Sequence, residues 1–361
     1  MNKVVKTIGV LSIASLVSTS AFSQITISGY AEVGFITGSA DGTRGTATSK
    51  GLGSEFLVTV AGKGSMSNGW TYSAYQNFDT DEVGNGRDVA NSNPMTTRAI
   101  ELSPSKDIKL FYTYDGVYGG EIARTAVPKV TERAVDMTGQ STLAEFIDVT
   151  SGGHAVGFEV LNVGPVGRLS VAYNPNLDAT QSMSSDRVYS ATNFNTGGRN
   201  TAAGYSIGYS VTPGPIKVAL GYTKIEDTAT ASSVDPTSKT LGVTYTASSF
   251  AIGAQRTKNS DGRKISGTLL FEDKVDTISA SFAASKEFTL GAAYSKMERE
   301  VPGSVAGPDT KVIQLVAAYN LGPVVASISY EDAQDKNAGA NAISLAGIDS
   351  TLTKIKVKAN F

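Results

Sequence analysis

The strongest constraint in this chain is a two-residue alternation of apolar and polar side chains that recurs in segment after segment. At its first occurrence one parity holds Ile25, Ile27, Val33 and Phe35, and the other holds Thr26, Ser28 and Glu32. Successive side chains of a β-strand point to opposite faces, so each such segment predicts a strand with one apolar and one polar face. The pattern returns at residues 205–211, 216–223, 288–294, 326–330 and 354–361. The sequence therefore predicts an all-β protein.

The connections between these segments alternate between short and long. The short ones carry turn residues and lie at 103–107, 162–165, 212–215, 248–249, 285–286 and 321–323. The long ones lie at 37–51, 79–96, 115–152, 175–202, 226–238, 298–310 and 334–349. Tight turns at one end of the strands and long loops at the other are typical of a transmembrane antiparallel β-barrel.

Aromatic residues support a membrane location. Near the long connections, the apolar parity holds Tyr173, Tyr222, Tyr294 and Tyr330; near the short ones it holds Trp70, Tyr209, Tyr245, Phe250, Phe288, Tyr319 and Phe361. Two rings of aromatic side chains are expected where a barrel meets the two interfaces of a bilayer. A secreted adhesin or a soluble all-β sandwich is the alternative, and these belts count against it.

The strand count needs one correction before it fits a barrel. A first count is odd, whereas single-chain bacterial barrels have an even number of strands. The segment 265–274 breaks the alternation at Leu269, Leu270 and Phe271, so we assign residues 258–274 to a long loop. About 16 strands remain, and a barrel of that size encloses water rather than a packed core.

The chain start and the composition narrow the possibilities further. Lys3 and Lys6 precede an apolar run and then small residues, which predicts a signal peptide at 1–23 and a barrel domain at 24–361. With no cysteine and one histidine, thiolate chemistry, disulfides and multi-histidine metal sites are excluded. The 31 basic and 33 acidic residues nearly balance, so the composition does not indicate nucleic-acid binding.

Basic residues on the polar parity predict a water-filled interior. They are Lys109, Arg168, Lys217, Lys354, Lys356 and Lys358. A lysine on the lipid face near mid-membrane costs roughly 2–4 kcal/mol, so three lysines at alternate positions before the C-terminus must share the aqueous side. Phe361 has the other parity and falls at the membrane boundary, where a ring is favoured.

Three stretches resemble the Gram-negative general porins, which are trimeric diffusion channels. They are ITISGYAEVGF at 25–35, GSEFLVTVAGKGSMSNGWTYSAYQNF at 53–78 and RAIELSPSKDIKLFYTYDG at 98–116. The likeness extends over the mature chain in layout, and Phe361 matches the aromatic that the family presents to the barrel-assembly machinery. One departure is that many relatives carry a glycine-arginine pair where this chain reads Thr113-Tyr114-Asp115-Gly116.

The resemblance implies that residues 115–152 fold inward as a constriction loop. Its acidic residues are Asp115, Glu121, Glu132, Asp136, Glu145 and Asp148. They would form one charged wall, and the inward basic residues would form the opposite wall, because fixed charges at a constriction select ions by sign. The alternative is that these charges only solvate an exterior loop.

The resemblance also implies a function. The expected protein is a passive channel for ions and small hydrophilic solutes in the cell outer membrane, surrounded by outer-membrane lipids. It needs no cofactor and assembles as a homotrimer, with residues 79–96 latching onto a neighbour.

The sequence is also compatible with other functions. A substrate-selective channel would carry an aromatic slide inside the lumen, and only Tyr30, Tyr75 and Phe111 have inward parity. An outer-membrane hydrolase could use His154, which we expect at the rim. The acidic run 79–82 could bind calcium, although a solvated loop is the simpler interpretation.

Overall fold

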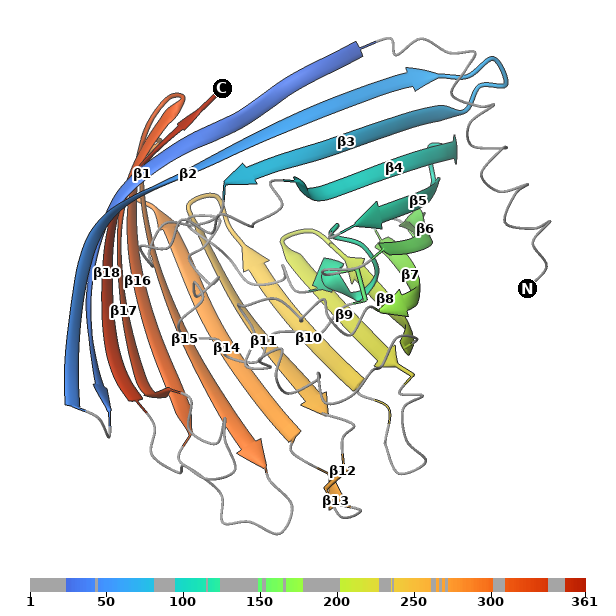
Figure 1. The fold of residues 1–361 in the computed structure, drawn as a ribbon. Helices are drawn as coiled ribbons and strands as arrows, with labels where there is room; N and C mark the ends of the chain where they lie inside the picture. Colours follow the sequence, from blue (N-terminus) through green and yellow to red (C-terminus); the bar gives the residue numbers. More distant parts are fainter. Residues whose placement is uncertain are drawn as a thin grey trace.

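The structure is a computed structural model, and its strands close into one antiparallel barrel (Figure 1). It describes residues 24–42, 45–80, 95–114, 116–123, 149–150, 154–164, 167–177, 202–226, 235, 237–260, 264–265, 268–269, 272–300, 309–336 and 348–361. The predicted signal peptide at 1–23 lies outside these residues. Within them, no helix is long and apolar enough to cross a membrane.

The first half of the barrel wall is built from eight strands. They are β1 (Gln24–Gly42), β2 (Gly45–Ser65), β3 (Thr71–Thr80), β4 (Met95–Ser105), β5 (Ile108–Tyr114), β6 (His154–Val163), β7 (Gly167–Leu177) and β8 (Ala202–Val211). A single 3-10 turn, η1 (Gly119–Ala123), follows β5 in the described part of the chain.

The second half continues around the ring. It contains β9 (Ile216–Ile225), β10 (Thr237–Thr246), β11 (Phe250–Ser260), β14 (Glu272–Ala283), β15 (Phe288–Glu300), β16 (Thr310–Leu321), β17 (Val324–Lys336) and β18 (Ile348–Asn360). The short strands β12 (Lys264–Ile265) and β13 (Thr268–Leu269) pair only with each other. The barrel therefore has 16 strands as predicted, and Leu269 lies outside its wall, as expected.

The ring closes where the first strand meets the last. β1 pairs with β18 from Tyr30↔Asn360 to Asp41↔Asp349. Gly29 and Phe361 exchange two main-chain hydrogen bonds of 3.0 Å just beyond that register. A Cβ at Gly29 would lie 2.0 Å from the carbonyl oxygen of Leu57, so this position requires glycine. Closure satisfies the main-chain groups that an open sheet edge would expose.

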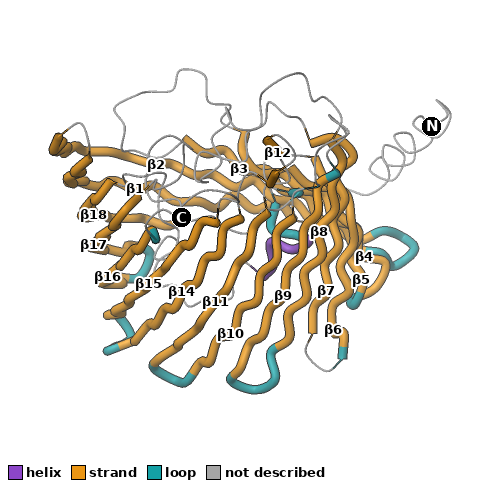
Figure 2. Tube along the Cα trace, turned by 90° about the horizontal axis from the view of Figure 1, so that it is seen from below, coloured by secondary structure: helices purple, strands orange, loops and turns teal. Residues whose placement is uncertain are grey.

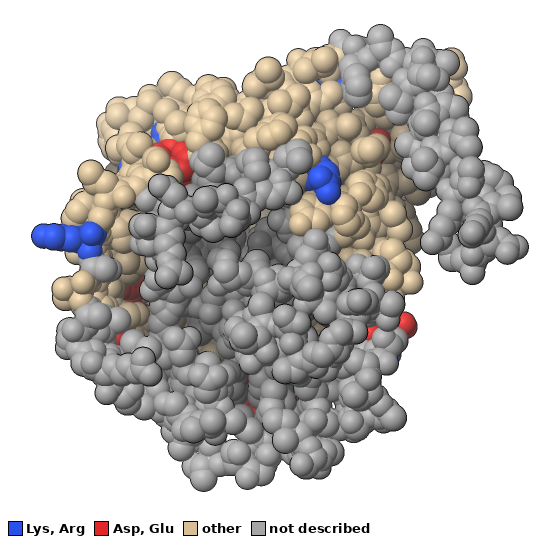
Figure 3. Space-filling view, in the orientation of Figure 1, with Lys and Arg blue, Asp and Glu red and all other residues tan. Residues whose placement is uncertain are grey.

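The alternation sorts side chains between the two faces of the wall as predicted. The outer face carries exposed apolar residues, among them Ile27, Leu220, Ile278 and Ile355. The inner face carries small and polar ones, among them Ser170, Ser206, Thr240, Thr257 and Ser279, all buried. The described surface that faces the viewer in Figure 3 is mostly uncharged. This inside-out arrangement suits a lipid exterior and an aqueous interior.

Both aromatic belts lie on the outer face. Near the long connections Tyr173, Tyr294 and Tyr330 are 48%, 39% and 38% exposed. Near the short turns, rings pair across neighbouring strands: Tyr245 with Phe250 at 5.8 Å, and Phe288 with Tyr319 at 6.5 Å between centroids. The short turns gather at one end of the barrel (Figure 2). Gly214 and Gly322 provide the positive φ that two of these turns require.

One predicted loop is wrong. Residues 37–51 are not a long loop, because β1 continues to Gly42 and β2 begins at Gly45, with Gly42 opposite Gly45. This extension is rich in Gly, Ser, Thr and Ala, so its sequence carries no apolar and polar alternation that would reveal a strand. The loop 258–274 was also drawn too wide, since β11 reaches Ser260 and β14 starts at Glu272.

Candidate functional site in the barrel lumen

The segment after β5 turns into the barrel and packs on its inner wall. η1 contacts β7, β8 and β9, and it lies inside the ring of strands in both Figure 1 and Figure 2. Ile122 and Ala123 are buried there, 4% and 0% exposed. The predicted inward course is therefore observed for residues 116–123, the described beginning of the connection between β5 and β6.

Hydrogen bonds hold this segment to the wall. The amide of Gly119 donates to Oγ of Ser170 on β7 at 2.7 Å, and the amide of Gly120 donates to Oγ of Ser206 on β8 at 2.9 Å. Gly208 permits the close approach, because a Cβ there would lie 2.1 Å from the carbonyl oxygen of Gly119. Each bond contributes about 0.5–1.5 kcal/mol.

The other described end of the connection docks on the same strand. Val149 is fully buried, and its carbonyl oxygen accepts a 3.0 Å hydrogen bond from Nδ2 of Asn174 on β7. Both ends of the loop therefore lie against the inner face of β7. Asp115, Glu132, Asp136, Glu145 and Asp148 lie outside the described residues, and of Glu121 only the backbone is described.

A tyrosine links the loop to charged groups on the strands. Tyr118 stacks on Phe111 with 4.0 Å between ring centroids, and its hydroxyl donates to Glu101 Oε1 at 2.7 Å. Burial raises the pKa of the Tyr118 hydroxyl, and nearby Tyr75 and Glu101 raise it further, so the hydroxyl keeps its proton and remains a donor. Sequence reasoning had missed Tyr118, because a single tyrosine in a long loop carries no periodic signal.

Three of the predicted basic residues share the wall that the loop covers. Lys109 contacts Glu101 at 2.9 Å and Glu159 at 3.7 Å, and Arg168 donates to Glu159 through Nε at 3.0 Å. Glu159 is fully buried between them. Lys217 lies on the inner face of the barrel near the start of β9. The paired charges Glu101, Lys109, Glu159 and Arg168 form a chain near the short-turn end, on strands β4 to β7.

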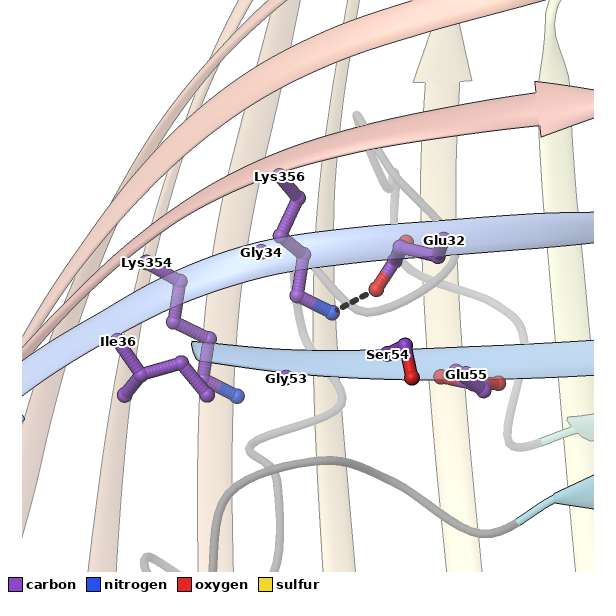
Figure 4. A pocket seen from close by; sticks show the side chains of 8 residues that line it. All are labelled: Glu32, Gly34, Ile36, Gly53, Ser54, Glu55, Lys354 and Lys356. Atoms are coloured by element: carbon purple, nitrogen blue, oxygen red, sulfur yellow. Dashed lines mark hydrogen bonds and ion pairs between the residues drawn. The ribbon is translucent and has the colours of Figure 1, made fainter. Parts of the chain in front are cut away.

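The other predicted basic residues lie across the lumen. Lys354 and Lys356 are on β18, which is eight strands from β8 in either direction around the ring of 16. Both side chains extend from β18 across β1, and Lys356 pairs with Glu32 at 2.5 Å (Figure 4). They line a pocket with Glu55 of β2, and Lys358 follows with Nζ 3.4 Å from the Tyr30 ring centroid. Lys354 and Lys356 thus face the loop from the opposite side of the barrel.

Solved structures with a similar fold include porins. A mutant of the Rhodobacter blastica porin is 13% identical, with 94% of this chain and 100% of that chain covered and a TM-score of 0.59. A porin structure refined at 1.8 Å is 14% identical with the same coverage and TM-score. The chain has the porin fold. One of a set of engineered proteins studied for asymmetric conductivity also matches, with a TM-score of 0.56, 14% identity and the same coverage.

By sequence alone the chain has no such neighbours. No protein-family model matches it, and no curated protein matches it. The porin fold is therefore shared at 13–14% identity, and the function of this chain has to be argued from its own residues.

His154 lies on the outside of the porin fold. It starts β6 at the long-loop end, and its Nδ1 is 2.7 Å from the Tyr112 hydroxyl. Its ring also contacts Tyr114, at 4.9 Å between centroids, and Tyr114 lies under the guanidinium of Arg98. No carboxylate or serine contacts His154 within the described residues. Asp148 and Ser151, which precede His154 closely in the sequence and could complete a hydrolytic site, lie outside them. The four described side chains form an aromatic rim cluster.

Proposed function

We propose that this protein is a porin, a water-filled channel in the bacterial outer membrane for passive diffusion of ions and small hydrophilic solutes. The observation that carries the proposal is the start of the β5–β6 connection, fixed inside a closed 16-strand barrel opposite the lysines of β18. A barrel of this size holds water, so the inward loop and the facing side chains control what passes.

The charges in the lumen suggest how the channel treats ions. The acidic loop residues Asp115, Glu121, Glu132, Asp136, Glu145 and Asp148 are proposed to face Lys354 and Lys356, while Lys109, Arg168 and Lys217 line the wall below the loop. Opposite charges on facing walls produce a transverse field where water is scarce, and this field orients dipolar solutes and sorts ions.

The test is electrical recording in a planar bilayer. Purified, refolded protein should insert with stepwise increases in conductance; its absence with a verified folded barrel would contradict the channel. The double substitution Lys354→Glu and Lys356→Glu should shift the reversal potential in a salt gradient toward cation preference. Lys50→Glu is the matched control, because Lys50 is exposed and lies opposite Thr37 on the outer face of β2. An unchanged potential in the double variant would place these lysines outside the selective zone.

Assembly and partners follow from the same proposal. We expect a homotrimer embedded in outer-membrane lipids, with the connection 79–96 at a protomer contact and Phe361 read by the barrel-assembly machinery. No nucleic acid and no cofactor enters this function. The described residues contain no group of three or more potential metal ligands, and the acidic run considered for calcium lies at and beyond the end of β3.

The enzyme alternative has little support from geometry. His154 faces outward against two tyrosines rather than into the lumen. A substrate-selective channel is the closer rival. Tyr30 lies under Lys358, Phe111 lies under Tyr118, and Tyr75 packs against the same cluster as Phe111. The three inward rings are thus engaged with neighbours rather than arranged as a continuous slide.

A further inference from the structure

A row of three lysines crosses the outside of the barrel at the long-loop end. Lys239 on β10 lies opposite Lys258 on β11, and Lys258 lies opposite Lys274 on β14. All three have the parity of the outward apolar residues Leu241 and Ile278 on the same strands. With strands about 4.8 Å apart, the row is about 10 Å long. We call these three residues the lysine row.

This arrangement is unfavourable unless something neutralises it. Like charges directly opposite each other on neighbouring strands are destabilising. On the β14 flank carboxylates pair with the row: Lys258 with Glu272 at 2.8 Å, and Lys274 with Glu300. On the β9 flank the described carboxylate Asp235 pairs with Lys224 at 2.8 Å instead. On this flank Lys239 is exposed, and its described partner is the Tyr222 ring, 5.9 Å from Nζ to the centroid. The charge is therefore least balanced at Lys239.

The position of the lysine row along the strands indicates its depth in the membrane. The next outward side chains toward the middle of the membrane, two positions along each strand, are Leu241, Arg256 and Asp276. Arg256 and Asp276 form a bidentate pair at 2.6 and 2.7 Å. Apolar side chains follow below. Strands rise about 3.3 Å per residue and tilt by about 40°, so the row lies about 10 Å beyond the last fully apolar level. That is the depth of the polar headgroups.

From these observations we propose that the lysine row binds the phosphate groups of lipids in the leaflet at the long-loop end. The phosphate oxygens accept hydrogen bonds from the three ammonium groups and relieve their mutual repulsion. The apolar band beneath the row holds the acyl chains of the same lipids. Arg256, 71% exposed despite its pair with Asp276, lies where it can join the same headgroup.

The proposal rests on the membrane location proposed above, and it concerns the outer surface rather than the pore. Failure of the two is distinguishable, because conductance reports the channel whether or not phosphate lipids bind. A channel that conducts in a neutral bilayer but shows no preference for phosphate lipids would leave the porin standing and remove the lysine-row site.

The experiment compares lipids that differ in headgroup charge. Protein is reconstituted in phosphatidylcholine with or without phosphatidic acid, and co-purifying lipid is counted by native mass spectrometry. The wild type should retain phosphatidic acid in preference to phosphatidylcholine. Because each basic residue near the surface contributes on the order of 1 kcal/mol, Lys239→Gln should weaken retention about fivefold. The triple variant with Lys258→Gln and Lys274→Gln added should lose the preference.

Controls separate a specific row from general attraction. Lys50→Gln removes one exposed outward lysine at the same end of the barrel, where its described cross-strand partner is Thr37, and it should retain phosphatidic acid like the wild type. A triple variant that folds and still retains phosphatidic acid would overturn the proposal, as would an equal loss in Lys50→Gln. In detergent, phosphatidic acid should raise the unfolding temperature of the wild type, and inorganic phosphate at the same concentration should not. An equal rise with both would show that the lipid is unnecessary.

Discussion

At the residue scale, the smallest side chain in the lumen has one of the largest structural roles. Gly208 lets η1 lie directly on β8, since the carbonyl of Gly119 occupies the volume where a Cβ would be. Ser170 and Ser206 then accept hydrogen bonds from two backbone amides of this turn. The loop is thus positioned by the absence of one atom and by two hydroxyl groups.

Gly208→Ala should push η1 away from the wall and toward the pore axis. We expect a lower single-channel conductance and more frequent transient closures, both read from bilayer recordings. Gly51→Ala is the control: Gly51 is also on the inner face, opposite Ile36, but a Cβ there has nothing within 4 Å. A Gly208→Ala channel with wild-type conductance and noise would contradict the role given to this contact.

At the element scale, the sequence is informative where a strand separates lipid from water and uninformative elsewhere. Alternation located the strands that cross the apolar band, because exchanging the two faces of such a strand would place lysines such as Lys356 in hydrocarbon. It failed in the extension of β1 and β2 at 37–51. It also could not show that Tyr118 would dock on Phe111, because that contact joins a loop to a strand and follows no period.

The seam strand carries the element-scale prediction. Phe361 exchanges two main-chain hydrogen bonds with Gly29 and stacks on Phe56 at 5.8 Å. Deleting Phe361 removes both bonds, worth about 1–3 kcal/mol together, and leaves the edge of β1 less covered. The folded fraction after refolding, read from the mobility of unheated samples in a gel, should fall.

Matched variants separate the ring from the main chain. Phe361→Ala keeps the backbone bonds and should fold better than the deletion. Phe250→Ala removes a ring of similar exposure at the same end of the barrel but away from the seam, and it should resemble Phe361→Ala. Equal folding of the deletion and Phe250→Ala would show that closure does not depend on the last residue.

At the scale of the whole molecule, the two faces of the barrel wall suit lipid outside and water inside. The chain contains no cysteine, so single cysteines can report the environment of each face. Ser327→Cys lies on the inner face of β17 opposite Lys356, and Ile328→Cys lies on the outer face opposite Ile355. In vesicles, a charged thiol reagent should label position 327 rapidly and position 328 slowly. Similar rates at both positions would contradict the assignment of the faces.

The pairing of the first strand with the last has a consequence for biosynthesis. The ring cannot close until β18 has been synthesised, so a product that stops short of this strand lacks a complete barrel. Such fragments would present two unmatched ribbons of amide and carbonyl groups, which hydrocarbon does not tolerate. Insertion of a closed barrel therefore has to wait for β18, because only this strand can cover the free edges of both β1 and β17.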